Sequence, residues 1–257
     1  MKSRSEMKKM NGLFIIGIAL ILSACAPSQK KLAEQREKDP QYQYDKAVVC
    51  MQYGLADEAF KYLNEAIRLD PQHYLSFNLL GLAYMVKANP TEAVKAFTNC
   101  LAIKPDFSEA HNNLGTAYQE SGQIDKAEAA FRKAYELDQS YNASFNLARI
   151  NYDKNKLDQA LEYIQKSLDK YDRSILAWNL KGLILESRDK IDEAITCYER
   201  ALKILPGEVN ISFNMGVAYY KAGRFDKAKE IMEKILPLAK TEDLRTKIGE
   251  ILKRIKS

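Results

Sequence analysis

The sequence of 257 residues is poor in the residue types that build disulfide-linked or histidine-dependent sites. It holds two histidines and four cysteines. A disulfide-built scaffold is therefore excluded, and little remains for a histidine metal site or a catalytic histidine. The motifs GxxxxGKS/T, GxGxxG, HExxH, GxSxG and CxxC are absent as well. The net charge of +5 is too small, and the apolar fraction of 46% too large, for a disordered chain.

An apolar run long enough to span a membrane is also lacking near the N-terminus. The run from Leu13 to Leu22 has ten residues, whereas a membrane-spanning helix needs about 20. Basic residues precede this run and small residues end it. We therefore predict that residues 1–24 are a secretory signal that is not part of the fold.

The end of this signal carries a more specific mark. Leu22-Ser23-Ala24-Cys25 directly follows the apolar run and resembles a bacterial lipobox. The resemblance implies that Cys25 becomes the first residue of the mature protein and carries the lipid, palmitate included. Ala26 stands where an Asp would indicate retention in an inner membrane, so the resemblance implies the outer membrane, facing the periplasm. An ordinary cleaved signal with a coincidental cysteine is the alternative.

The segment after Cys25 is polar and charged, and Pro27 and Pro40 stand near its ends. This composition predicts a flexible tether over residues 25–39. The alternative is a frayed first helix, because KKLAEQREK consists of good helix formers.

The rest of the chain repeats itself. An alanine recurs with a spacing of 33 or 34 residues, at 59, 93, 127, 160, 194 and 228. Two residues before each alanine stands a residue of the kind that caps helix N-termini: Asp57, Thr91, Asp125, Asp158, Asp192 and Asp226. Further upstream lies an expected turn position, occupied by Gly54, Ala88, Gly122, Asn155, Asp189 and Gly223.

Each period also predicts two helices that approach closely. The first helix carries a small residue where the second must pack: Ala47, Gly81, Gly115, Ala148, Gly182 and Gly216. The second helix carries a bulky residue four positions after its alanine: Leu63, Phe97, Phe131, Ile164, Tyr198 and Met232. Three of the second helices are followed by Pro71, Pro105 or Pro206, which cannot continue a helix.

These marks resemble the tetratricopeptide repeat (TPR), a 34-residue helix–turn–helix. The resemblance covers residues 40–241 and implies an all-α, right-handed α-solenoid. It divides into six repeats at 40–73, 74–107, 108–140, 141–174, 175–208 and 209–241. Repeat 1 is atypical because Lys46 stands where a leucine is usual.

A single helical pair cannot cover its own apolar face, so the last repeat needs a lid with a polar outer side. Residues 242–257 supply one. Their apolar residues share one helical face: Leu244, Ile248, Ile251, Leu252 and Ile255. We predict a C-terminal capping helix; a free helix that binds a partner or a membrane surface is the alternative.

Nothing in the repeats indicates chemistry. His73 and His111 fall at turn and packing positions, and the acidic residues fall at helix starts and on outer faces. Cys50, Cys100 and Cys197 lie within predicted helices, where we expect shielded free thiols. We therefore predict no enzyme activity, no cofactor, no metal site and no small-molecule substrate. The exported location and the lack of a basic stripe argue against nucleic acid.

A groove remains as the candidate site. In TPR proteins the first helix of each repeat presents partner-binding side chains on the concave face, and the resemblance carries this role to repeats 1 and 2. The residues are more apolar there than in later repeats: Tyr44, Val48, Met51, Leu75, Asn78, Leu82, Met85 and Val86. Methionine adapts its shape and recurs where grooves hold helices. The alternative is that residues 30–40 or another N-terminal extension cover this face.

The lipobox, the tether and six repeats together resemble the type IV pilus pilotin lipoproteins. That resemblance implies a scaffold anchored to the membrane by its lipid. Its protein partner would be an amphipathic helix of the outer-membrane secretin subunit, whose assembly a pilotin assists. A scaffold of another envelope complex, for polysaccharide export or peptidoglycan synthesis, is the alternative.

Overall fold

The computed structural model describes residues 29–256. The predicted signal (residues 1–24), Cys25 and Ser257 lie outside the described residues. By their internal contacts the residues fall into two compact lobes. The N-terminal lobe extends to Asn89 and the C-terminal lobe starts at Pro90. Each lobe is described by itself.

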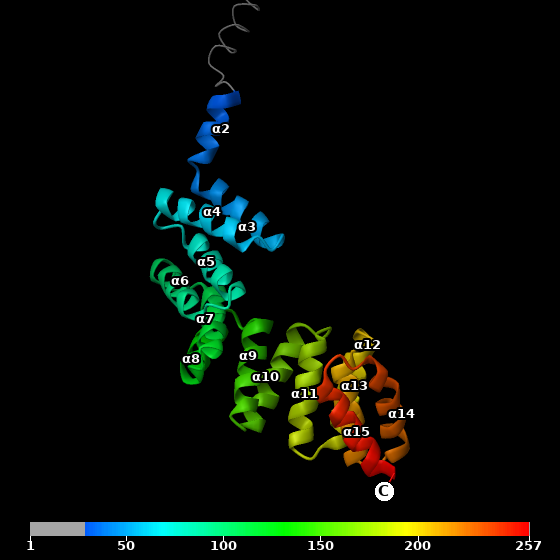
Figure 1. Ribbon diagram of the computed structural model, residues 1–257. Helices are drawn as coiled ribbons and strands as arrows, with labels where there is room; N and C mark the ends of the chain where they lie inside the picture. The colour runs from blue at the N-terminus through cyan, green and yellow to red at the C-terminus, as the bar shows by residue number, and fades with distance from the viewer. Residues whose placement is uncertain (1–28, 257) are drawn as a thin grey trace, which may run out of the picture. The chain divides into compact units, whose positions relative to one another are not determined.

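Every regular element among residues 29–256 is helical (Figure 1). The first helices of the repeats, the A helices, each have 13 residues: α3 (Pro40–Gln52), α5 (Tyr74–Val86), α7 (Ser108–Glu120), α9 (Tyr141–Asp153), α11 (Ile175–Ser187) and α13 (Val209–Lys221). The B helices are α4 (Ala56–Leu69), α6 (Pro90–Ile103), α8 (Ile124–Asp138), α10 (Leu157–Lys170), α12 (Ile191–Ile204) and α14 (Phe225–Ile235). The predicted all-α fold of consecutive helical repeats is confirmed.

The turn from each A helix to its B helix depends on a left-handed residue. All six predicted turn positions have positive φ: Gly54 (73°), Ala88 (52°), Gly122 (73°), Asn155 (56°), Asp189 (61°) and Gly223 (71°). This conformation is strained for residues with a Cβ, least so for Asn and Asp. The turn prediction is confirmed even where alanine stands in place of glycine.

The predicted capping role of the acidic residues is wrong. The N-cap lies two residues before the predicted position, at a residue such as Gln123 or Lys190 that makes no side-chain cap bond. The aspartates lie inside the first turn, where a negative charge favours the helix dipole. They also bind a cation of the next repeat: Asp57–Lys87 (2.8 Å), Asp125–Lys154 (2.7 Å), Asp158–Arg188 (2.9 Å) and Asp192–Arg224.

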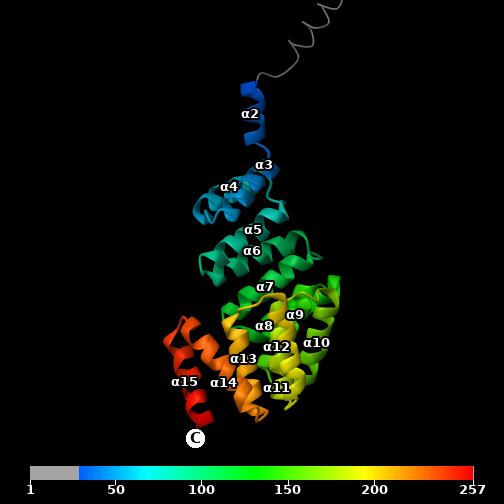
Figure 2. The same cartoon turned by 90° about the vertical axis from the view of Figure 1, so that its right-hand side faces the viewer.

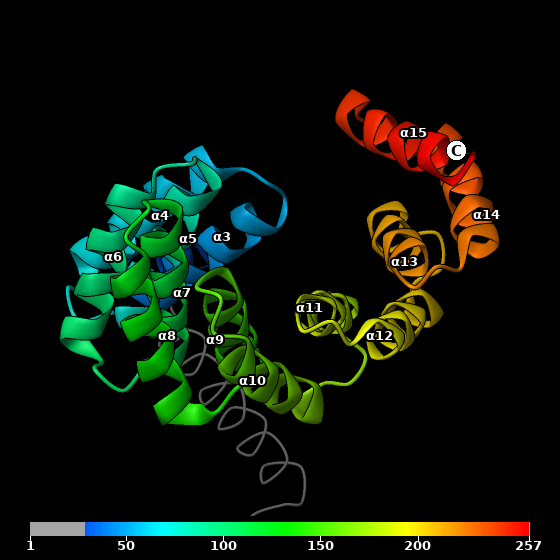
Figure 3. The same cartoon turned by 90° about the horizontal axis from the view of Figure 1, so that it is seen from below.

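The predicted close approach between A and B helices is present in the C-terminal lobe. A Cβ added to Gly115 would lie 2.6 Å from the Phe131 ring, and one on Gly216 would lie 2.7 Å from Met232. Figure 3 shows that α9, α11 and α13 line the inner side of this part of the lobe, with α10, α12 and α14 outside them. The small residues therefore set the spacing of the inner and outer layers.

The last repeat ends differently from the others. Pro237 follows α14, and the chain continues through a short 3-10 helix, η1 (Leu236–Leu238), to α15 (Glu242–Lys256). Ile248 of α15 is buried together with Met232 and Ile235, and Leu244, Ile251 and Leu252 pack around them. Helix α15 thus caps the apolar side of repeat 6, as predicted.

Residues 29–37, predicted as part of a flexible tether, instead form helix α2 (Gln29–Glu37). The alternative of a first helix therefore holds. The end of α2 is tied to α3, because Gln43 Nε2 donates to the Glu37 carbonyl oxygen (2.7 Å) and to its carboxylate (2.8 Å). Asp39 then caps α3 by accepting from Gln41 N at 3.0 Å.

Candidate protein-binding groove

The three candidate residues of α3 lie on one side of that helix. Tyr44, Val48 and Met51 are separated by four and three residues and are all half-buried. Tyr44 and Met51 pack on the core formed by Ala47 and Leu63. Their inner parts therefore stabilise repeat 1, and their outer parts remain open to a partner.

Helix α5 contacts α3 and contributes the remaining candidates. Leu75, Leu82 and Met85 are half-buried, and Val86 is 64% exposed. Asn78 is 5% exposed. The structure therefore corrects one expectation: Asn78 is buried and is not open to a partner.

His73 closes one end of this apolar surface. Its ring meets the Tyr44 ring edge-on, with 5.4 Å between centroids. Its Nδ1 lies 2.8 Å from Ser76 Oγ, and its Nε2 lies 3.3 Å from Gln41 Oε1. The histidine holds Tyr44 in place, as expected for a packing residue rather than a catalytic one.

The groove is not covered by the segment that precedes it. Leu32, the one large apolar side chain of α2, is exposed. Helix α2 is joined to α3 through Glu37, which pairs with Lys46 at 3.1 Å. Within the described residues, α2 therefore does not fill the groove that the alternative assigned to residues 30–40.

The inner face of the C-terminal lobe has a different chemistry, because polar pairs connect its A helices. Asn146 Nδ2 donates to Asn112 Oδ1 (2.9 Å), and Asn214 Nδ2 donates to Asn179 Oδ1 (3.0 Å). A further pair joins Lys221 Nζ to Glu186 (2.7 Å). These side chains bind one another across neighbouring repeats.

Glu186 also accepts from the hydroxyl of Tyr198 at 2.9 Å. Burial and this carboxylate raise the pKa of Tyr198 far above its ordinary value. The phenol is therefore a permanent hydrogen-bond donor within the inner face.

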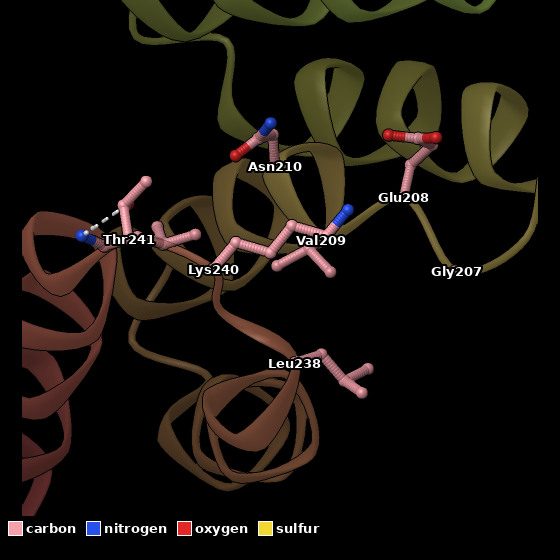
Figure 4. Close-up of a pocket in the computed structure, with 8 residues that line it drawn as sticks. Gly207, Glu208, Val209, Asn210, Leu238, Lys240 and Thr241 are labelled. Atoms are coloured by element: carbon pink, nitrogen blue, oxygen red, sulfur yellow. Dashed lines mark hydrogen bonds between the residues drawn. The ribbon is translucent and has the colours of Figure 1, made fainter.

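One hollow was missed by the sequence analysis. A depression of about 530 Å³ lies where α13, η1 and the start of α15 meet (Figure 4). The signal for it is Pro237, which prevents α14 from reaching the length of the other B helices. Its lining mixes charged and apolar side chains: Gly207, Glu208, Val209, Asn210, Leu238, Lys240, Thr241 and Leu244.

The cysteines of the described residues are free thiols. Cys100 and Cys197 are buried and Cys50 is half-buried, and burial raises the pKa of Cys197 to about 11. A thiol with such a pKa stays protonated and is a poor nucleophile. The three cysteines act as small packing residues.

Two kinds of feature are absent from residues 29–256. None of the helices there has both the length and the apolar character needed to cross a bilayer. In the same residues, three or more His, Cys, Asp or Glu side chains do not gather as a metal site would require.

The helical repeats and their apolar groove define a tetratricopeptide-repeat scaffold for protein–protein interaction. The chain belongs to the family described as tetratricopeptide repeat protein 21 C-terminal ARM domain, whose model matches residues 56–255. Repeats of this family are generally non-catalytic scaffolds.

Individual proteins are similar over part or most of the chain. The peroxisomal targeting signal receptor of Saccharomyces cerevisiae is 26% identical over 108 residues, which are 41% of this chain and 18% of the receptor. This chain thus spans less than a fifth of that relative.

Two solved structures share the fold over most of their length. PilF of Pseudomonas aeruginosa has a TM-score of 0.74 at 16% identity, over 84% of this chain and 99% of PilF. PilW, described as a widely conserved type IV pilus biogenesis factor, has a TM-score of 0.74 at 18% identity, over 80% of this chain and 97% of PilW. Likeness at such identity shows the fold alone.

Proposed function

We propose that this protein is a lipid-anchored scaffold of the bacterial outer membrane that acts as a pilotin in type IV pilus biogenesis. The observation that carries the proposal is the open apolar surface of α3 and α5 in the lobe next to the lipobox cysteine. The surface offers Val48, Leu82 and Met85 half-buried and Val86 exposed. Apolar residues at this helical spacing suit an amphipathic helix laid into a groove.

The fold comparisons support this proposal through the extent of the match. PilF and PilW are covered over 99% and 97% of their own chains. The repeats of this chain therefore match almost the whole length of those two structures in fold. The pilus role itself is proposed from the resemblance of the lipobox and the six repeats together to the pilotin lipoproteins.

The proposed mechanism has two parts. The groove holds an amphipathic helix of a secretin subunit and shields its apolar side from water. The lipid on Cys25 then keeps the pair at the outer membrane, because several acyl chains anchor a protein stably. The secretin subunit thus meets other subunits where the ring must assemble.

The anchor is tested by labelling cells with a palmitate analogue. The wild-type chain is expected to carry the label and to sediment with outer membranes. Cys25→Ala should lose both, with Cys50→Ala as the matched control that keeps them. Label on the Cys25→Ala protein would contradict the lipobox.

The groove is tested by the double substitution Leu82→Glu with Met85→Glu. The two substitutions place carboxylates in the apolar groove. Co-purification of the partner should fall at least tenfold, because burying an unpaired carboxylate against an apolar surface costs free energy. Leu176→Glu, at an exposed site of the C-terminal lobe, is the matched control. Circular dichroism confirms that each variant is folded. Undiminished co-purification by the double variant would rule out this groove.

The pilotin role is tested by deleting the gene and measuring heat-stable secretin multimers in outer membranes. We expect their loss, and their recovery when the wild-type chain is restored. Intact multimers would reject the role. Proximity labelling from the anchored protein then identifies the complex, and labelled polysaccharide exporters or peptidoglycan synthases would favour the alternative scaffold function.

A further inference from the structure

A second stripe lies along α3 on the side opposite the groove, with Tyr42 and Lys46 half-buried and Val49 and Tyr53 exposed. Tyr42, Lys46, Val49 and Tyr53 are separated by four, three and four residues and therefore share one helical face. At 100° per residue, this face points about half a turn away from Tyr44 and Val48. The stripe and the groove are therefore two distinct surfaces of the same helix.

In the other repeats this same face is buried against the preceding repeat. The residues at the position of Val49 are all fully buried: Ala83, Ala117, Ile150, Ile184 and Ala218. Val49 itself is 50% exposed and Tyr53 is 78% exposed. Among the described residues, repeat 1 has no repeat before it, so a stacking surface is left open.

The composition of the stripe is not that of a polar lid. Terminal repeats normally carry a polar outer face that keeps a solenoid soluble. Here the leucine expected at position 46 is replaced by a lysine, whose Nζ lies over the Tyr62 ring (4.2 Å) and the Tyr42 ring (5.4 Å). The result is a ridge of tyrosine, lysine, valine and tyrosine.

Such side chains suit the boundary between lipid and water. Tyrosine prefers this boundary because its ring is apolar and its hydroxyl is polar. Lysine can bury its aliphatic stem along apolar surface, and the ammonium group of Lys46 is paired with Glu37 at 3.1 Å. The stripe therefore has the chemistry of a helix that lies on a membrane surface.

Helix α2 ends beside the stripe, because Glu37 pairs with Lys46 at 3.1 Å. Figures 1 and 2 show that α2 leaves the N-terminal lobe on the side of α3 and α4 away from α5. Helix α2 has nine residues and is thus about 14 Å long. Cys25 lies four residues before α2, so a lipid on Cys25 would hold the stripe at a high effective concentration near the membrane.

We propose that the Tyr42–Lys46–Val49–Tyr53 stripe docks on the surface of the membrane that holds the Cys25 lipid. The inference rests on the lipid anchor of the proposed function. Docking orients the N-terminal lobe, because the groove on the other side of α3 then faces away from the bilayer. A partner helix can reach the groove without competing with lipid.

The test uses tryptophan as a depth probe. Trp178 is the single tryptophan of the chain and is replaced by phenylalanine. Tyr53→Trp then places a probe on the stripe, and Tyr171→Trp places the matched control at a 50% exposed tyrosine of the C-terminal lobe. The full chain, isolated from membranes, is reconstituted in phosphatidylethanolamine–phosphatidylglycerol vesicles whose acyl chains are brominated.

We expect the Tyr53→Trp probe to be quenched at least twice as strongly as the Tyr171→Trp probe. Adding Val49→Asp should halve that quenching without changing flotation of the protein with vesicles. Flotation with equal quenching of the two probes would overturn the docking and leave the anchor standing. Protein that does not float would overturn the anchor and the docking with it.

A second copy is the competing occupant, and the same samples distinguish it. If copies cover the stripe, emission of the Tyr53→Trp probe shifts to the blue with rising protein concentration in detergent, without vesicles. If emission depends on concentration in this way and bromine does not quench it, the stripe binds a second copy of the chain instead of the membrane, and the proposal is overturned.

Discussion

The inner faces of the two lobes use the same helical frame for opposite purposes. In the N-terminal lobe, Val48, Leu82 and Met85 leave an apolar surface half open. In the C-terminal lobe, Asn146 binds Asn112 and Lys221 binds Glu186, so neighbouring A helices are joined by polar contacts. Inner-face side chains such as Tyr44 and Met51 pack on the core with one part only and are half-buried. They are therefore free to serve binding in one lobe and cross-linking in the other.

The energies involved explain why this division is tolerated. A hydrogen bond within a protein contributes about 1 kcal/mol net, and an exposed ion pair contributes about 0–1 kcal/mol. The stack itself depends on apolar packing around positions such as Gly115 and Phe131, where overpacking costs about 1–3 kcal/mol. Single residues on the inner face of either lobe can thus be substituted without loss of the repeat fold.

The largest effect is expected from a substitution that disturbs the close packing of an A helix on its B helix, which is common to both lobes. Gly182→Val places a branched side chain onto the Tyr198 ring, which an added Cβ would already contact. We expect the free energy of unfolding to fall by about 3 kcal/mol, measured by urea denaturation. Gly249→Ala is the matched control, because a Cβ there meets nothing within 4 Å. It should raise stability by about 0.5–1 kcal/mol; equal effects of the two substitutions would contradict the packing account.

The next prediction makes the inner face of the C-terminal lobe more like the apolar inner face of the N-terminal lobe. Asn146→Leu copies the residue that repeat 2 carries at the equivalent position, Leu79. It removes the donor to Asn112 Oδ1 and should cost about 1 kcal/mol in unfolding free energy. Asn142→Leu, at an exposed site of the same helix, is the control. An unchanged urea midpoint for Asn146→Leu would show that the amide pair adds nothing to stability.

The third prediction compares a turn of each lobe and concerns a change in unfolding free energy of similar size but opposite sign. Ala88 adopts φ of 52°, where Gly122 serves the same turn in the C-terminal lobe. Ala88→Gly relieves left-handed strain of about 1–2 kcal/mol, partly offset by the greater freedom of glycine when unfolded. We expect a net gain of about 0.5–1 kcal/mol in thermal unfolding. Gly122→Ala should lose a similar amount, and a stability loss for Ala88→Gly would refute the strain argument.

The smallest effect concerns pH and the contacts between repeats. Hydrogen bonds from Lys154 lower the pKa of Glu128 below its ordinary value of 4.5. A lowered carboxyl pKa adds stability above the ordinary value, and this stability is lost as the pH falls through the folded value. Lys154→Met should therefore flatten the decline of stability below about pH 5, followed by urea midpoints at several pH values. Lys170→Met, at an exposed site of α10, is the control, and identical pH profiles for both variants would disprove the coupling.

Much of the fold could be predicted from the sequence because the same marks recur. The six turn residues all have positive φ, although only Gly54, Gly122 and Gly223 among them are glycines. Asn155 taken alone would not indicate a turn, but its position in the 34-residue period does. The roles of the aspartates were not predictable in this way, because Asp125 finds Lys154 across a contact between repeats. The local sequence does not show which side chains of neighbouring repeats come within reach of each other.

The candidate groove was predicted only in part. The resemblance to the tetratricopeptide repeat places Val48 and Leu82 on inner faces, and both are half-buried. It places Asn78 there too, yet that residue is buried. The width of the open strip depends on how closely neighbouring helices approach, and this follows from side-chain volumes throughout the stack.

The sequence by itself determined the all-helical repeat, because small and bulky residues recur at one period and their contacts lie within a single repeat. The tertiary structure alone decided which surfaces stay open. Val49 is exposed because no repeat lies before repeat 1 among residues 29–256, whereas Ala83, at the same repeat position, is buried against repeat 1. Burial depends on what lies beside a residue in space, and a local pattern carries no information about an absent neighbour.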